Sequence, residues 1–492
     1  MMRTITVTLV LLMYSLSLFS QEHEQPMEFT LSKAIEIAQQ NSPSAVAARN
    51  SFCSRYWSYI RYKANYLPSL DFSSGPNFNH SISIITMPDG TSDFVGQNQL
   101  VTDGTFSLNQ NVALTGGTFF VRSALERLDI FDNNLTTYKS SPVIIGYQQS
   151  LTGYNRLKWD RKIEPLRFEE AQKSYIQTME TVAAQATAQF FNLAMAQTNL
   201  QIAQINYANA DTLYMFAQGR YKMGTITENE MLQLEINRLS EESNLLNSQI
   251  ETEDCMQEFK SFLGIKDQAT IMVKLENDVP SFVLDPDYTL ELALQNNPNI
   301  LAWKRLLLEG QSYVAQARTA RGFNIDLFAQ FGLTNSSREF DQVYKDPLNQ
   351  QSVQLGIRIP ILDWGRGKGN VEVARSNLNL TQTQVEQERA TFEQNVTKTV
   401  KQFNIQKWKI DIAVKTDSTT ERREEVSRRL YILGRSTILD MNSSIVEKNT
   451  AKRGYINALY SFWNLYFTIR RYTLYDFEKN APITVDYNEL IK

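Results

Sequence analysis

The sequence predicts an α+β fold in which strands alternate with very long helices, and three observations carry this prediction. In residues 352–361 the apolar residues Val353, Leu355, Ile357, Ile359 and Ile361 occupy every second position, the period of a strand with unlike faces. No proline occurs between Ile361 and Ala481, and the composition of that stretch favours helix. The two halves of the chain also share short motifs in the same order, which indicates an internal duplication.

The first residues predict a secretory signal peptide, residues 1–20. Arg3 precedes an apolar stretch from Thr4 to Phe19, and small or polar residues follow. The alternative is an N-terminal anchor, but the stretch is shorter than the ~20 apolar residues that a spanning helix needs. No later run of 18 apolar residues is present, so we expect no transmembrane helix. Cys53 and Cys255 are too few for a disulfide framework and are expected to be free thiols.

The duplication is visible as three matches. Residues 34–43 match 289–298 at an offset of 255 positions, whereas 150–156 match 360–366, and 221–224 match 431–434, at an offset of 210. The fall in offset means that the first copy holds 45 extra residues before Arg156. We place them at about 115–153, as one additional hairpin. The expected domains are therefore a first repeat, 21–287, and a second repeat, 288–492.

Each copy is expected to contain two helices, then two strands, then a long α-hairpin. The expected elements are the short helices Phe29–Asn41 and Tyr288–Asn297, the second helices Ser51–Tyr66 and Ala302–Arg321, and the strands Leu70–Ile84, Thr105–Leu114, 323–334 and 351–362. Glycine followed by Ser or Thr is expected to reverse each helical hairpin. The tips are predicted near 224, with Gly224 and Thr225, and near 434, with Ser436 and Thr437.

The strands suggest a membrane-spanning sheet. They are about ten residues long with one apolar face, and a transmembrane β-strand needs ~9–11 tilted residues. A half-buried strand pair on a soluble domain remains the alternative. Four strands per chain cannot close a barrel, because the smallest membrane barrels have about eight. We therefore expect an α+β membrane protein: a trimer whose 12-stranded transmembrane β-barrel continues into a long periplasmic α-helical barrel, with a mixed equatorial region.

This duplicated order of motifs resembles the TolC-like outer membrane efflux family. The stretches that carry the resemblance are 34–43 and 289–298, the strand-to-helix corner PILDWGR at 360–366, and the two hairpin tips. The resemblance implies a homotrimeric channel in outer membrane lipid, reaching into the periplasm and meeting a periplasmic adaptor and an inner-membrane pump. It assigns the corner to Pro360, Asp363, Gly365 and Arg366. It assigns adaptor docking to Gly224, Thr225, Gly434, Arg435 and Ser436.

The resemblance also implies an aperture near the tips, narrowed by acidic residues and held shut by tyrosine and arginine contacts. By position the acids are Glu230 and Asp440, and the tyrosine is Tyr431. Ser436 stands at the family's arginine position with Arg435 beside it, and Ser443 stands at a second acid position. A ring of carboxylates would attract cations and disfavour anions. The alternative for both acids is a solvated helix face.

Two other classes of protein are alternatives. An enzyme is disfavoured because the two histidines, His23 and His80, have no partners at metal-ligand spacing, and the glycines at 365–369 fit no phosphate-binding motif. We therefore expect no catalytic residue, cofactor or metal. The mild formal charge of −4 argues against a nucleic-acid partner. A soluble periplasmic coiled-coil scaffold or adaptor is the second alternative, since long α-hairpins would suit it.

Overall fold

The structure, a computed structural model, describes residues 27–266, 270–276, 279–433 and 435–491. The expected signal peptide, 1–20, and the expected tip residue Gly434 lie outside the described residues. The chain forms two compact units, which we treat separately. The first comprises residues up to Ser51, Lys173–Asn297 and from Phe392 onward. The second comprises Phe52–Gln172 and Pro298–Thr391.

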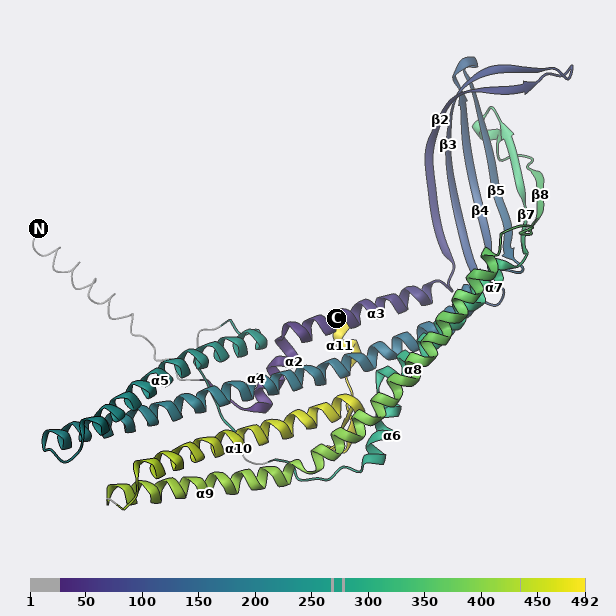
Figure 1. Ribbon diagram of the computed structural model, residues 1–492. Helices are drawn as coiled ribbons and strands as arrows, with labels where there is room; N and C mark the ends of the chain where they lie inside the picture. The colour runs from purple at the N-terminus through teal and green to yellow at the C-terminus, as the bar shows by residue number, and fades with distance from the viewer. Residues whose placement is uncertain (1–26, 267–269, 277–278, 434, 492) are drawn as a thin grey trace, which may run out of the picture. The chain divides into compact units, whose positions relative to one another are not determined.

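The second unit contains one antiparallel sheet of six strands (Figure 1). In spatial order these are β2 (Ser69–Thr86), β3 (Ser92–Val112), β4 (Gly117–Ile130), β5 (Leu135–Ser150), β7 (Asn324–Ser337) and β8 (Leu348–Arg358). Short 3-10 helices, η1 (Phe131–Asn133) and η2 (Phe340–Gln342), follow β4 and β7.

The expectation of four sheet strands is wrong in number. The additional hairpin expected at 115–153 corresponds to β4 and β5, and it pairs with β3 on one side and β7 on the other. A hairpin can be added in this way because it returns the chain to the end of the sheet from which it started. The helix after β5 can therefore begin where it would have begun without the two extra strands.

Helices of this unit are joined by aromatic and ionic contacts. They belong to α3 (Pro43–Ala64), α4 (Arg156–Lys222), α7 (Pro298–Arg321) and α8 (Arg366–Asn404). The rings of Tyr59 and Phe168 stack with centroids 4.4 Å apart, which fixes α3 against α4. Arg305 of α7 binds both carboxylate oxygens of Glu170 of α4, at 2.6 and 3.0 Å.

The first unit is mainly helical, with two small strand pairs. Its elements are α2 (Leu31–Asn41), α5 (Glu228–Leu263), α6 (Pro286–Asn296), α9 (Gln406–Ile432), α10 (Ile438–Thr473), α11 (Tyr487–Ile491), the parallel pair β1 (Met27–Phe29) and β6 (Ile271–Val273), and the antiparallel pair β9 (Tyr475–Asp476) and β10 (Ala481–Pro482). Its core combines small and large residues of α4 with large residues of α10. The buried members include Ala183, Thr187, Phe190, Leu193, Ile456, Leu459, Phe462 and Tyr466.

The two long helical arms differ between the halves. α4 is a single helix of 67 residues, about 100 Å at 1.5 Å per residue, and continues through Pro165. The corresponding arm after β8 is interrupted between α8 and α9, at Ile405. Beside this break the Asn404 side chain accepts from the Leu284 N–H at 2.9 Å and donates to its carbonyl at 2.8 Å. Within the described ranges, none of the helices combines the length and apolar character that crossing a membrane requires.

Candidate functional site

The six-stranded sheet has one apolar and one polar face. The register sets Phe72 opposite Phe106 and Leu327 opposite Leu355, so apolar side chains of neighbouring strands share a face. Phe72 and Val353 on this face are 60% and 77% exposed. The apolar face holds Leu70, Phe72, Phe78, Leu100, Phe106, Leu108, Phe119, Val121, Leu125, Ile145, Ile325, Leu327, Phe331, Val353, Leu355 and Ile357. The opposite face holds Asp71, Asn77, Asp103, Ser107, Arg122, Glu126, Lys139, Asp326, Gln330, Gln354 and Arg358.

One aromatic pair interrupts the polar face. Phe120 and Phe328 stack with ring centroids 5.8 Å apart, and the Arg122 guanidinium covers Phe120 at 4.2 Å from its ring centroid. Gly146 makes room for this ring, because a Cβ there would lie 2.2 Å from the Phe120 ring. Val101, Leu128 and Ile144 also lie on this face, among a majority of polar residues.

Aromatic side chains gather at the turn end of the sheet, beside η1 and η2. Phe78 lies 6.3 Å from Phe131, and Tyr138 lies 5.5 Å from Phe340, measured between ring centroids. Phe340 also contacts Tyr344 edge to face. Aromatic girdles of this kind mark the two edges of the apolar band in membrane sheets.

The strand-to-helix corner after β8 is organised by Asp363. Its carboxylate accepts the N–H groups of Gly365 at 3.0 Å and Gly367 at 2.8 Å, at the start of α8. These backbone donors hold the pKa of Asp363 below its ordinary value. Gly365 has a φ of +85°, which suits glycine. Pro360 and Arg366, the other predicted corner residues, are exposed beside this turn.

The first hairpin tip joins α4 to α5. Gly224 has a φ of +70°, and the Thr225 N–H donates to the Arg220 carbonyl at 2.9 Å, as in a Schellman motif. Thr227, rather than Thr225, is the N-cap of α5. The Thr227 Oγ1 accepts from the Glu230 N–H at 3.3 Å, and the Glu230 carboxylate accepts from the Thr227 N–H at 2.9 Å.

The second tip, between α9 and α10, repeats this chemistry 210 positions later. The Arg435 N–H donates to the Leu430 carbonyl at 2.9 Å, and Thr437 forms a capping box with Asp440. Ser436 adds a weak bond to Asp440 at 3.4 Å. The side chain of Tyr431 lies outside the described residues.

The two predicted aperture acids are therefore helix-cap residues. Hydrogen bonds from Thr227 lower the pKa of Glu230, and hydrogen bonds from Thr437 lower the pKa of Asp440, so both are ionised at neutral pH. Each carboxylate is bound inside its own tip, and the structure describes no contact between the two. The patterns T-x-x-E and T-x-x-D were the sequence signal for these caps.

Sequence reasoning missed the ionic links of the hairpin formed by α9 and α10. Three pairs cross between these helices: Arg423 with Glu447, Lys448 with Glu424, and Lys452 with Asp417. The α4–α5 hairpin has one, between Arg238 and Asp211 at 4.0 Å. Only the described residues enter this comparison. Charged residues are common on exposed helices, so their spacing along one helix did not indicate these partners.

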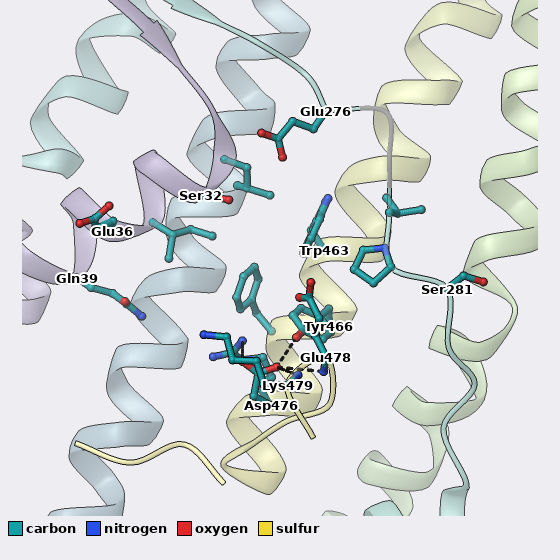
Figure 2. A pocket seen from close by; sticks show the side chains of 16 residues that line it. Ser32, Glu36, Gln39, Glu276, Ser281, Trp463, Tyr466, Asp476, Glu478 and Lys479 are labelled. Carbon is teal, nitrogen blue, oxygen red and sulfur yellow. Dashed lines mark hydrogen bonds and ion pairs between the residues drawn. The ribbon is translucent and has the colours of Figure 1, made fainter. Parts of the chain in front are cut away.

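Sequence reasoning also missed a buried ionic network in the first unit. Arg470 of α10 binds both oxygens of Glu180 of α4 at 2.7 and 3.0 Å, and also Asp476 at 3.0 Å. The Tyr466 hydroxyl donates to Asp476 at 3.0 Å, beside a cleft of about 750 Å³ (Figure 2). Burial raises the pKa of Glu180, although the Arg470 charge opposes the shift. Burial also opposes ionisation of Asp476, but the Arg470 charge and the hydrogen bonds from Lys479, Tyr466 and Glu478 together outweigh it, so the pKa of Asp476 is lowered.

The described residues include no candidate metal site. Across the described residues, no group of three or more His, Cys, Asp or Glu side chains is arranged to hold a metal ion. Neither Cys53 nor Cys255 forms a disulfide within the described chain, in line with the expectation from the sequence. The notable features are structural: a sheet with two unlike faces and two capped helical hairpins.

Solved structures of similar fold include outer membrane channels. The Campylobacter jejuni CmeC outer membrane channel matches 94% of this chain and 88% of its own, with 15% identity and a TM-score of 0.66. The Vibrio cholerae outer membrane protein VceC matches 92% and 97%, with 13% identity and a TM-score of 0.64. The open state of the Neisseria gonorrhoeae MtrE outer membrane channel matches 90% and 88%, with 16% identity and a TM-score of 0.53.

Family comparison goes further than these similarities of fold. A comparison with curated protein sequences gave no match. The model of the family described as outer membrane efflux protein matches residues 110–264 and 289–471, which together are more than half of the chain. This match confirms the resemblance to the TolC-like family that the sequence motifs indicated. The chain belongs to the outer membrane efflux protein family.

Proposed function

We propose that this chain is the exit duct of a tripartite efflux or type I secretion system. Family membership places it in the outer membrane as an efflux component, with a periplasmic extension. The observation that carries the finer proposal is the unlike pair of sheet faces. In a membrane sheet the apolar face contacts lipid and the polar face lines water, and the register here gathers most apolar side chains on one face across six strands.

The open edges of the sheet support assembly into a trimer. β2 and β8 each pair on one side only, and unpaired edges are not tolerated in lipid. One chain therefore needs further copies to complete the ring. Because each chain supplies six strands, three copies would bring 18 strands rather than the 12 expected from sequence. The channel itself carries out no chemistry, and an adaptor and an inner-membrane pump would supply the energy of transport.

We propose that the hairpin tips form the periplasmic aperture and the adaptor-docking surface. The tip residues Gly224, Thr225, Arg435 and Ser436 belong to two capped turns, and the tip acids Glu230 and Asp440 are exposed. In a trimer the two carboxylates of each chain would make a ring of six charges. Tyr431 and Arg435 remain candidates for contacts that hold this ring closed.

Two measurements test the proposal. The native mass of the protein extracted from outer membranes in mild detergent should equal three chains, and a monomer that needs no detergent would support a soluble scaffold instead. In planar bilayers, Glu230→Gln with Asp440→Asn should weaken block by divalent cations. These amides can still bind the N-cap, so the variants remove charge with little loss of capping. Unchanged block would remove the aperture assignment but leave the channel proposal standing.

A further inference from the structure

The hairpin of β2 and β3 extends well beyond the rest of the sheet. β2 pairs with β3 from Ser69 to Thr86, but β4 pairs with β3 only from Gln99 onward. Ser69–Asn79, the part of β2 level with β4, is long enough to span a bilayer, which takes ~9–11 residues per strand. Residues 80–98 continue beyond β4 as a ribbon of two strands, about 24 Å long at ~3.4 Å per residue. At its base the Asn98 N–H donates to the Asp132 carboxylate at 2.8 Å.

The apolar face of the sheet resumes on this ribbon beyond one polar pair, His80 opposite Asn98. Ile84 lies opposite Phe94, in the same alternation as Phe72 and Phe106 within the sheet. Ile82, Ile84 and Phe94 are 72%, 64% and 72% exposed. An isolated two-stranded hairpin is at best marginally stable in water. The exposed apolar face of the ribbon therefore requires a covering surface.

Position and charge indicate what covers it. The ribbon begins where the aromatic cluster of Phe78 and Phe131 marks the turn end of the sheet. Beyond that level it turns aside from the direction of the other strands (Figure 1). Apart from His80, its only ionisable side chains are Asp89 and Asp93, so it presents no cation to an acidic protein partner or to anionic headgroups. Attraction to a membrane surface would thus depend on apolar contact alone.

We propose that the ribbon formed by residues 80–98 lies on the outer leaflet of the membrane and binds lipid. Ile82, Ile84 and Phe94 insert at the boundary between headgroups and acyl chains, while Ser81 and Asp93 face water. The occupant follows from continuity, because the ribbon's apolar face prolongs the sheet face assigned to lipid. This inference rests on the proposed function, in which the sheet spans the bilayer.

The test uses the full chain reconstituted in phosphatidylcholine vesicles, with Cys53→Ser and Cys255→Ser as background. Single cysteines at Ile84→Cys, Ser81→Cys and Val353→Cys carry an environment-sensitive fluorophore. Ile84 reports the apolar face of the ribbon, Ser81 its polar face, and Val353 the apolar face of the sheet. Lipids with a nitroxide near the headgroup or deep in the acyl chain then quench each probe. Ile82→Cys replaces Ile84→Cys if that variant fails to assemble.

We expect the probe at position 84 to show blue-shifted emission. The shallow nitroxide should quench it at least twofold more than it quenches the probe at position 81. Both the emission and the quenching at position 84 should be the same at 50 and 500 mM salt. Position 353 should be quenched by the deep nitroxide. Emission at 84 typical of water would overturn the inference. So would blue-shifted emission without lipid quenching, because a protein surface or a second copy would then cover the ribbon. Absence of quenching at 353 would instead contradict the membrane-spanning sheet, so the two failures are distinguishable.

Discussion

Glu230 and Asp440 show how one residue can satisfy both a structural and an electrostatic requirement. Each carboxylate closes a capping box at the start of a returning helix, so the acid is needed locally whatever passes between the tips. The low pKa values of both groups arise from the same hydrogen bonds. The hydrogen bonds that cap the helix therefore also keep each carboxylate ionised at the hairpin tip, where the proposed ring of charges would lie.

Acidification should loosen these caps. For a carboxylate whose pKa is lowered by folding, the stabilisation is complete above the ordinary pKa and is lost as pH falls through the lowered value. Amide protection at residues 228–231 should therefore decrease between pH 6 and pH 3, after correction for intrinsic exchange. Glu230→Gln should abolish this pH dependence, because the amide does not titrate. Thr227→Ala should lower protection about fivefold at every pH, the effect of losing ~1 kcal/mol of capping.

Arg470 is the residue whose loss should cost most in the first unit. Its side chain is 17% exposed and neutralises Glu180, which is 3% exposed. Arg470→Met would leave that carboxylate buried without a partner, at a cost of about 3 kcal/mol in the free energy of unfolding. The double variant Arg470→Met with Glu180→Met should recover at least half of this loss, because no unpaired charge remains at Glu180. Denaturant midpoints in detergent measure both, and equal losses would show that burial of the charge is not the cause.

At the scale of single elements, the sequence predicts the position of an element where a local residue pattern determines it. It does not predict the position where a contact with a distant residue determines it. Alternation of apolar residues led to strands at 323–334 and 351–362, and the structure has β7 and β8 at Asn324–Ser337 and Leu348–Arg358. The break between α8 and α9 had no such signal. Asn404 binds the backbone of Leu284, which is distant in sequence, and neither glycine nor proline marks the position.

The strand count shows the same limit. The extra residues of the first copy, at about 115–153, suggested a hairpin but not its neighbours, because pairing partners depend on the register between strands. The candidate site likewise has features that the local sequence predicts and features that it does not. The hairpin tips and the Asp363 corner follow from local glycine and Asp chemistry, whereas the Arg470 network joins residues of α4 and α10 that no local pattern connects.

The α9–α10 hairpin should depend on salt more than the α4–α5 hairpin does. Three ion pairs cross the former, and Glu424 within them is only 6% exposed. Screening weakens exposed pairs, so amide protection along α9 should fall more between 50 and 500 mM salt than protection along α5. Lys448→Met should destabilise α9 by about 1 kcal/mol, and Lys452→Met by less because its pair is more exposed. Equal salt effects on both hairpins would contradict this account.

At the scale of the whole molecule, the number of strands constrains the assembly. Only residues 151–155 join β5 to α4, and only residues 359–365 join β8 to α8. Because these connections are short, each helix must begin close to the end of its strand. In a symmetric assembly the ring of strands and the ring of helices therefore need similar circumferences. Strands ~4.8 Å apart and tilted by ~40° each occupy about 6 Å, so 18 strands need roughly 110 Å and 12 strands roughly 75 Å. In the unit that holds the sheet, each chain contributes four helical arms, from α3, α4, α7 and α8. Twelve arms at ~9–10 Å spacing need about 110–120 Å.

The match favours a ring in which all six strands of each chain take part. We therefore predict that electron microscopy of the detergent-extracted protein will show three-fold symmetry and 18 strands in one closed sheet. A count of 12 strands would mean that one hairpin of each chain leaves the ring, and the extra residues of the first half would then form an appendage. Conductance provides an independent check, because pore area rises roughly with the square of strand number and should be about twofold larger for 18 strands than for 12.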